Sequence, residues 1–423
     1  MKNYLLIFVV LQLLLSVPLL NAKSNETEQN VLILKGRVIA ADTRMPLSNA
    51  TLTVENSNVS GITNQDGYFT LRVPETVRNS KLTVRFLGYE NMEIPIVTLV
   101  GKSNDNIALN PSPIELGTVE IVSGDGTELV REALARVAQN YSADPKMMIA
   151  FYRESIKKNS NYISLVEAVL DVYKASYKSF EGDQEKIYIG RRATDISPRD
   201  TVLMKFQGGI SAAMMLDVAK NPDIIFGANA DEYSFQIERL ININNKPNYV
   251  IDFSPLPGIQ EILFRGKIYL DVSTLAFSRV EFNMNVEGRK DATNIFIRKK
   301  PAKMKVDVEE ARYVADFVES NGKWYFNYSS TEVKFKVRWT NRFFGLFSTS
   351  YIIGSEIAVT DRYENGVSKF PRKERIRSSD VIAEKVEYFQ DPDFWGEYNV
   401  IEPDLEITKA IKRLSGKLSR RAE

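Results

Sequence analysis

The sequence has no cysteine and no histidine among its 423 residues. The absence of cysteine excludes disulfide bonds, thiolate metal sites, cysteine nucleophiles and a lipidated N-terminal cysteine. The absence of histidine removes the commonest general base and the commonest metal ligand. We therefore predict that the protein is not an enzyme, that it uses no metal or other cofactor, and that its stability comes from packed apolar cores.

The chain also lacks an excess of either charge, because 55 Lys and Arg residues stand against 54 Asp and Glu residues. A balanced chain produces no overall field that would attract nucleic acid, which is therefore not an expected partner. The apolar fraction of 44% and the charged fraction of 26% are those of an ordinary globular protein. The length predicts about two or three domains.

The N-terminus has the pattern of a secretory signal peptide. Lys2 precedes an apolar run over 5–20, and small residues around Ala22 suit cleavage there. A membrane anchor is the alternative, but Gln12 and Pro18 interrupt the run, which is short for a spanning helix. We expect export across the inner membrane to the periplasm or to the periplasmic face of the outer membrane.

Short apolar-polar alternations separated by turn residues fill the stretch from Val31 to about Asn110. Such spacing predicts a small β-sandwich. The dipeptide Asp66-Gly67 predicts a tight hairpin turn, because glycine accepts positive φ and aspartate can bond its own turn.

An ordered set of motifs runs through the same stretch: Gly36-x-Val38, Pro46-Leu47-x-x-Ala50, Gly61-x-Thr63-x-x-Asp66-Gly67-x-Phe69 and Phe86-x-Gly88-Tyr89. With these motifs the stretch resembles the carboxypeptidase regulatory-like (transthyretin-like) domain of Bacteroidota envelope proteins. The resemblance implies an appended β-sandwich. It implies no peptidase activity, because a zinc carboxypeptidase needs histidine ligands.

The segment from Phe264 to Val286 shows period-two alternation on both sides of a turn near Ser273-Thr274. The residues Phe264, Gly266, Ile268, Leu270 and Val272 share one parity, and Arg265, Lys267, Asp271 and Ser273 share the other. This pattern predicts an antiparallel hairpin with one apolar and one solvated face. Further strands of this kind and a helix at 211–220 predict a mainly β protein. The expected strands are 149–157, 162–173, 233–242, 249–253, 311–319, 324–330, 332–339 and 351–361. We expect a large curved antiparallel sheet or half-barrel with a few helices, placed after the sandwich.

The sequence RGKIYLDVSTLAFSRVEFNM within this hairpin resembles a strand pair of LolA-like periplasmic lipoprotein carriers. The segments FYRES, MMLDVAKNPDIIF and DFWGEYNVIEP resemble the large domain that accompanies the regulatory-like module in Bacteroidota proteins. These resemblances imply a concave sheet that takes a lipid or a lipoprotein.

An apolar segment interrupts what should be a polar turn after Trp339. The segment places four large side chains around Gly345: Phe343, Phe344, Leu346 and Phe347. Apolar residues in a loop can mark a ligand or membrane contact, which makes these four and Trp339 the candidate site. The alternative is two core strands joined by a tight glycine turn.

The C-terminal residues predict a basic amphipathic helix. Its apolar stripe consists of Ile407, Ile411, Leu414 and Leu418, and Lys409, Lys412, Arg413, Lys417 and Arg420 lie beside the stripe. Such a helix can lie on an anionic membrane, can dock on a partner, or can pack on its own protein.

Two further patterns bear on catalysis. Ser155 and Lys158 match Ser-x-x-Lys, but their segment alternates like a strand, whereas that nucleophile pair needs a helix start. Asp391, Asp393 and Glu397 could serve acid-base chemistry or hold calcium. The alternative is an exposed turn whose aromatic residues fix the C-terminal segment.

We therefore predict a non-enzymatic cell-envelope protein that binds a hydrophobic or lipidic ligand, or a lipidated partner, through the large sheet. This hypothesis requires an apolar cavity open to solvent. An assembly accessory of an outer-membrane protein complex is the alternative, and a hydrolase is a minor one. The expected parts are a signal peptide (1–22), the sandwich (31–110), a linker with a helix (111–145), the large β domain (146–400) and the C-terminal helix (401–423).

Overall fold

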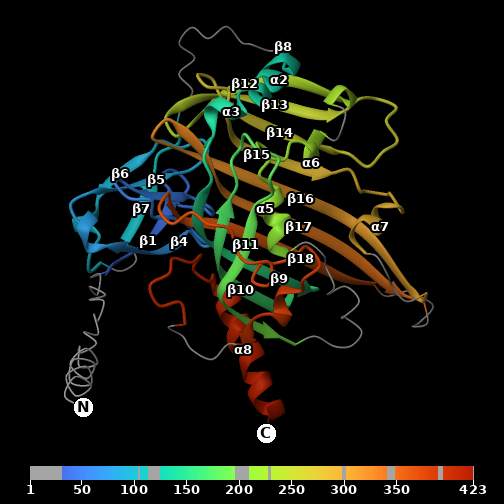
Figure 1. Cartoon of the computed structure of the whole chain (residues 1–423). Helices are drawn as coiled ribbons and strands as arrows, with labels where there is room; N and C mark the ends of the chain where they lie inside the picture. The colour runs from blue at the N-terminus through green and yellow to red at the C-terminus, as the bar shows by residue number, and fades with distance from the viewer. Residues whose placement is uncertain are drawn as a thin grey trace, which may run out of the picture.

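A computed structural model describes residues 31–102, 105–112, 124–195, 209–226, 230–297, 302–340, 348–388 and 394–422. The predicted signal peptide lies outside these residues. Figure 1 shows a small blue module at the left, a large twisted sheet that fills the centre, and a red helix that leaves at the bottom.

The N-terminal module is built from two small sheets that enclose one apolar core. One sheet has the order β4-β1-β7 and the other β3-β2-β5-β6. Residues such as Leu34, Leu52 and Leu71 are fully buried between them, which confirms the predicted sandwich. The strands are β1 (Val31–Ala40), β2 (Thr51–Val54), β3 (Ser60–Ile62), β4 (Tyr68–Pro74), β5 (Lys81–Arg85), β6 (Met92–Pro95) and β7 (Asp105–Leu109).

The turn at Asp66-Gly67 does not close a hairpin, and that prediction is wrong. The turn joins β3 to β4, which belong to different sheets. The Asn64 side-chain oxygen accepts the backbone N–H groups of Asp66 (3.0 Å) and Tyr68 (2.9 Å). Gly67 has φ +80°, and a Cβ there would lie 2.5 Å from the Val38 carbonyl oxygen. The dipeptide therefore marks a turn, but the packing of the two sheets decides where the chain goes next.

Within the described residues, the large sheet has twelve strands in the order β19-β11-β10-β9-β18-β17-β16-β15-β14-β13-β12-β8. Neighbouring strands are antiparallel except the short β19 beside β11, and the edge strands β19 and β8 do not close the sheet. This confirms the predicted mainly β fold class. The strands are β8 (Gly124–Asp125), β9 (Lys146–Lys158), β10 (Asn161–Lys174), β11 (Gln184–Thr194), β12 (Tyr233–Ile243), β13 (Lys246–Pro255), β14 (Phe264–Asp271), β15 (Phe277–Met284), β16 (Met304–Ser320), β17 (Lys323–Trp339), β18 (Ser348–Tyr363) and β19 (Glu387–Tyr388).

The predicted hairpin is β14 and β15, paired from Phe264 opposite Met284 to Leu270 opposite Phe277. The residues of its predicted apolar face are buried as expected, for example Ile268 and Val280. The prediction that the polar face is solvated is wrong at Asp271, which is buried. Its carboxylate accepts hydrogen bonds from the turn that follows, including the Thr274 N–H at 2.8 Å.

Short helices cover one face of the large sheet, and the long C-terminal helix packs on the other. The helices of the described chain are α2 (Thr127–Ala135), α3 (Val137–Asn140), α5 (Gly209–Met215), α6 (Asp223–Phe226), α7 (Ala292–Phe296) and α8 (Leu405–Ala422). Apolar residues of α2, α3, α5 and α6 join one cluster with those of the strands beneath. None of the described helices combines the length and the apolarity that spanning a bilayer requires. The part of this face beneath α2, α3, α5 and α6 is a filled core.

The opposite face carries the N-terminal module and the C-terminal segment. The Ser60 hydroxyl donates to the Val359 carbonyl across this contact at 2.8 Å. The Asn399 side chain accepts the Arg72 N–H at 2.7 Å and donates to the Arg72 carbonyl at 2.9 Å. The central strands are thus covered on both faces, by helices on one face and by the N-terminal module and the C-terminal segment on the other.

Candidate functional site

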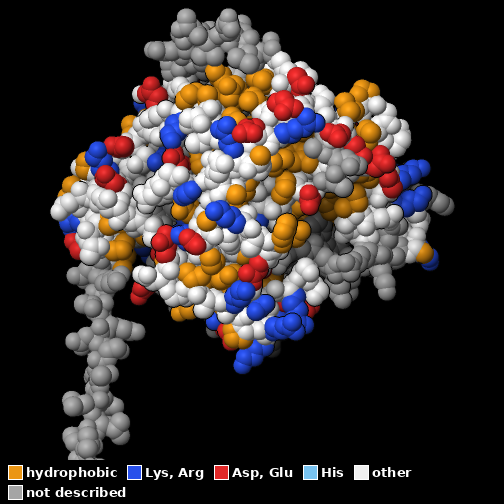
Figure 2. All heavy atoms as spheres, turned by 45° about the horizontal axis from the view of Figure 1, so that its top comes forward, with side chains coloured by type: hydrophobic (Ala, Val, Ile, Leu, Met, Phe, Trp, Pro, Cys, Tyr) orange, Lys and Arg blue, Asp and Glu red, His pale blue; other side chains and the backbone are white. Residues whose placement is uncertain are grey.

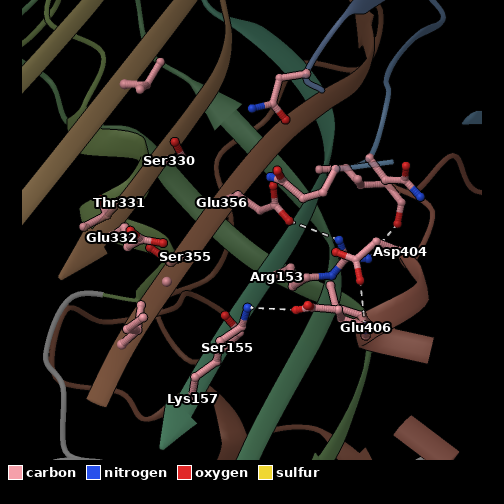
Figure 3. Close-up of a pocket in the computed structure, with 18 of the residues that line it drawn as sticks. Arg153, Ser155, Lys157, Ser330, Thr331, Glu332, Ser355, Glu356, Asp404 and Glu406 are labelled. Atoms are coloured by element: carbon pink, nitrogen blue, oxygen red, sulfur yellow. Dashed lines mark hydrogen bonds and ion pairs between the residues drawn. The ribbon is translucent and has the colours of Figure 1, made fainter. Parts of the chain in front are cut away.

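A polar cleft of about 580 Å³ opens where three parts of the chain meet on the sheet face opposite the short helices. Strands β9, β16, β17 and β18 form its floor, the turn at Asp66 forms one wall, and the start of α8 forms another. Figure 3 shows Arg153, Ser155 and Lys157 of β9 beside Glu356 of β18, with polar atoms directed into the space.

A ladder of alternating charges crosses four neighbouring strands at one side of the floor. Arg191 on β11 lies opposite Glu167 on β10, Glu167 opposite Arg153 on β9, and Arg153 opposite Glu356 on β18. Arg153 bonds Glu167 through Nε at 2.9 Å and Glu356 through Nη1 at 3.1 Å, and Arg191 Nε bonds Glu167 at 3.0 Å. Opposite charges at directly paired positions stabilise a sheet, so the ladder fixes strand register as well as charge.

The ladder is buried, and its charges compensate one another. Burial by itself acts to lower the pKa of Arg153, but Glu167 and Glu356 more than offset it and leave that pKa raised. Arg153 Nη2 also donates to the Ile401 carbonyl at 2.7 Å. The Arg191 guanidinium lies 4.6 Å from the Trp395 ring centre. The ladder therefore ties the C-terminal segment to the sheet, and its charges are not available to a ligand.

The wall formed by α8 depends on two aspartates from distant parts of the chain. The Asp404 carboxylate accepts the Ile407 N–H at 2.7 Å, which caps the helix. The Asp66 carboxylate accepts the Leu405 N–H at 3.0 Å. Lys157 reaches across the cleft mouth to Glu406 at 3.2 Å (Figure 3). The N-terminal module, the sheet and the helix are thus joined around the cleft.

The cleft owes its depth to Gly354. In the register of the sheet this glycine lies between Ser155 on β9 and Glu332 on β17. A Cβ at position 354 would stand 3.2 Å from the Ser155 hydroxyl oxygen. Ser155, Ser330 and Glu332 line the space beside it. The floor therefore offers hydroxyl groups and a carboxylate, which suit a ligand that forms hydrogen bonds.

The predicted site residues lie elsewhere. Trp339 ends β17, is partly buried, and packs on an apolar cluster that includes Met304 and Phe335. Four members of the predicted site lie outside the described residues: Phe343, Phe344, Leu346 and Phe347. The strands on either side end at Trp339 and begin at Ser348, and the predicted contact stays a prediction.

The C-terminal helix uses its apolar stripe internally. Ile407 and Leu414 are buried against Tyr162 and Leu165 of β10. This confirms the packed-helix alternative for the described part of the stripe, while the Leu418 side chain lies outside the description. Figure 2 shows Lys and Arg side chains at the lower end of the molecule, where Figure 1 places α8. The basic side of the helix thus stays at the surface.

The described residues do not bring either catalytic pattern into a catalytic arrangement. Ser155 lies on a strand, as its alternation predicts, and not at the helix start that Ser-x-x-Lys requires. Asp391 and Asp393 lie outside the described residues, and Glu397 is exposed. Trp395 is buried 5.6 Å from the Phe151 ring, which confirms that this aromatic residue fixes the C-terminal segment.

The larger clefts between described residues do not have the apolar lining that a lipid ligand would need. The sheet face beneath α2, α3, α5 and α6 is filled, and the two clefts of ligand size, of about 580 and 680 Å³, are lined mainly by polar side chains. Sequence reasoning missed the polar cleft because its residues come from the sandwich, four strands and α8. One feature of the sequence does point to this cleft. The central strands carry charged residues, notably Arg153 and Glu167, at positions that alternate with apolar ones.

Comparisons with known proteins agree with the N-terminal resemblance. A family model described as a CarboxypepD_reg-like domain matches residues 34–121. No curated protein matches the chain.

Solved structures show only weak likeness. A DUF1329 family protein from Desulfovibrio piger is 15% identical, with 58% of this chain and 96% of that chain covered and a TM-score of 0.23. A LolA superfamily protein from Nitrosomonas europaea is 11% identical, with 60% and 98% covered and a TM-score of 0.20. MucB in complex with MucA(peri) is 10% identical, with 55% and 94% covered and a TM-score of 0.17. At these TM-scores the likeness carries no conclusion about function.

Proposed function

We propose that the protein is a non-enzymatic binding protein of the cell envelope, and that its polar cleft takes a neutral ligand rich in hydroxyl or amide groups. The observation that carries this proposal is the division of the floor into two parts. The charge ladder beside Arg153 is internally compensated, whereas Ser155, Ser330 and Glu332 around Gly354 face open space. A ligand that forms hydrogen bonds can engage the second part without breaking the first.

Export to the envelope is part of the same proposal, and it rests on the leader-like segment that precedes Ala22. Uncharged glycan fragments such as N-acetylglucosamine oligosaccharides carry both sugar hydroxyls and amide groups. They are therefore a suitable probe of the ligand class.

The test is isothermal titration of these fragments into the wild-type protein and two Gly354 variants. Gly354→Val suits a strand but places two methyl groups in the cleft, so we expect binding to weaken at least tenfold. Gly354→Ala adds only a Cβ and should have a smaller effect. Wild-type protein that binds neither the fragments nor simple oligosaccharides would refute the proposal, and so would a Val variant that folds and binds like wild type.

A second candidate is a lipidic ligand or lipidated partner at the outer half of the helical face. The observation that favours it is Trp339, a large and only partly buried side chain at the edge of an apolar cluster. Delipidated protein should then increase the fluorescence of an acyl-chain probe, and Trp339→Ala should reduce the increase. No increase with the wild-type protein would exclude this candidate.

A further inference from the structure

A second cleft, of about 680 Å³, lies between the N-terminal module and the large sheet and shares no lining residue with the first. The turn between β2 and β3 forms one wall. The ends of β16 and β18 and the start of β17 form the other. Thr53, Asn58 and Asn321 supply hydroxyl and amide groups, and two arginines enter from opposite walls.

Arg362 comes from the large sheet and has no carboxylate partner among the described residues. Its Nη2 donates to the Phe326 carbonyl and to Asn327 Oδ1, both at 3.0 Å, and its guanidinium lies 5.8 Å from the Tyr325 ring centre. Its Nε is buried without a hydrogen-bond partner. Burial lowers the pKa of Arg362 to about 10, because these neutral contacts do not balance the loss of water.

Arg85 comes from the end of β5 in the N-terminal module. Its Nε is also buried without a partner. Burial lowers the pKa of Arg85, and the fields of Glu319 and Glu93 offset this only in part. Arg279 shows the contrast, since it bonds Asp316 at 2.6 Å and its pKa is raised.

The carboxylates at the cleft are largely committed to lysines. Glu319 pairs with Lys246, and Glu364 pairs with Lys146. Glu55 is exposed at the rim. Arg85 and Arg362 are therefore cations of the cleft that form no ion pair in the described structure. A buried cation without a partner is unfavourable, and an anion placed between them would remove that penalty.

We propose that this cleft binds an oxyanion, a phosphate or carboxylate group, between Arg85 and Arg362. The guanidinium fork matches two oxygens of such a group, and both arginines line the cleft. Because the arginines belong to different parts of the chain, the bound anion also ties the N-terminal module to the sheet. The ligand class differs from that of the first cleft, which has no such arginine pair in the described structure.

The test is titration of inorganic phosphate and, separately, citrate into the full chain at constant ionic strength, with chloride as the reference. Wild-type protein should bind at least one of them, and Arg85→Gln should weaken that binding at least tenfold. Arg85→Lys keeps the charge but loses the fork, so it should fall between the two. The exposed Arg372→Gln makes the same charge change away from the cleft and should bind like wild type.

The second variant is Arg362→Lys. Arg362→Gln is less suitable, because it removes a buried charge that also donates to the Phe326 backbone carbonyl. Arg362→Lys should weaken binding of the same anion. Preference for phosphate or for citrate identifies the group, and either supports the proposal. The proposal is overturned if the wild-type protein binds neither anion, or if folded Arg85→Gln binds like Arg372→Gln.

Discussion

Glu185 should make the stability of the protein depend on pH between 5 and 8. This residue of β11 is buried beneath α5, where the Ser211 hydroxyl donates to its carboxylate at 3.1 Å. Burial is the main cause that raises its pKa to about 7 from an ordinary 4.5, with the nearby charge of Asp183 in the same direction. Lys174 opposes the shift but is itself paired with Asp183 and Asp217.

The sign follows from proton binding. Between pH 4.5 and 7 the folded protein keeps a proton on Glu185 that the unfolded chain releases, so the folded state loses stability as pH rises. With these two values, the penalty grows by about 2.5 kcal/mol from pH 5 to pH 8 and is then constant. Glu185→Gln is neutral at every pH, can still bond Ser211, and should escape the penalty.

The assay is urea denaturation of wild type and Glu185→Gln at pH 5 and pH 8. We expect the variant to gain about 2.5 kcal/mol relative to wild type between the two pH values, with similar m-values. The exposed Glu384→Gln, on the segment that follows β18, is the matched control and should show no such change. A difference between variant and wild type that stays constant from pH 5 to pH 8 would refute the reasoning.

Two other substitutions test the frame of the first cleft. Arg153→Met leaves the partly buried Glu356 without its cation and leaves the buried Glu167 with Arg191 alone, so the free energy of unfolding should fall by about 3–5 kcal/mol in chemical denaturation. A loss below about 1 kcal/mol would show that the ladder does not act as a buried network. Asp404→Ala removes the acceptor for the Ile407 N–H and should cost about 1 kcal/mol. Hydrogen exchange in that variant should quicken at the start of α8, and unchanged exchange would contradict the capping role.

Local pattern was sufficient where a strand kept its alternation. The hairpin of β14 and β15 and most strands of the sheet follow from period-two spacing, which the structure confirms. Positions 324–330 and 332–339, expected as two strands, form the single strand β17. The helix expected in the linker begins at Thr127, and the Asp125 carboxylate accepts the Thr127 N–H at 2.9 Å.

Strand β11 shows why one element was missed. The register with β10 shifts between Ile187 and Ile189, which leaves Tyr188 as an extra residue. Ile187 then packs on the helical face and Ile189 on the opposite face, although residues two apart normally share a face. A bulge set by the neighbouring strand removes the periodicity on which sequence prediction depends.

The sequence by itself determined the absence of cysteine and histidine chemistry, the mainly β class, the sandwich motifs and most strands, because these depend on composition and on neighbours along the chain. Only the tertiary structure determined which polar faces of the strands are buried. The N-terminal module and the C-terminal segment cover the sheet face that alternation assigns to solvent, and so Arg153 and Glu167 became a buried ladder. The two clefts exist for the same reason, since each is a gap between parts that are distant in sequence.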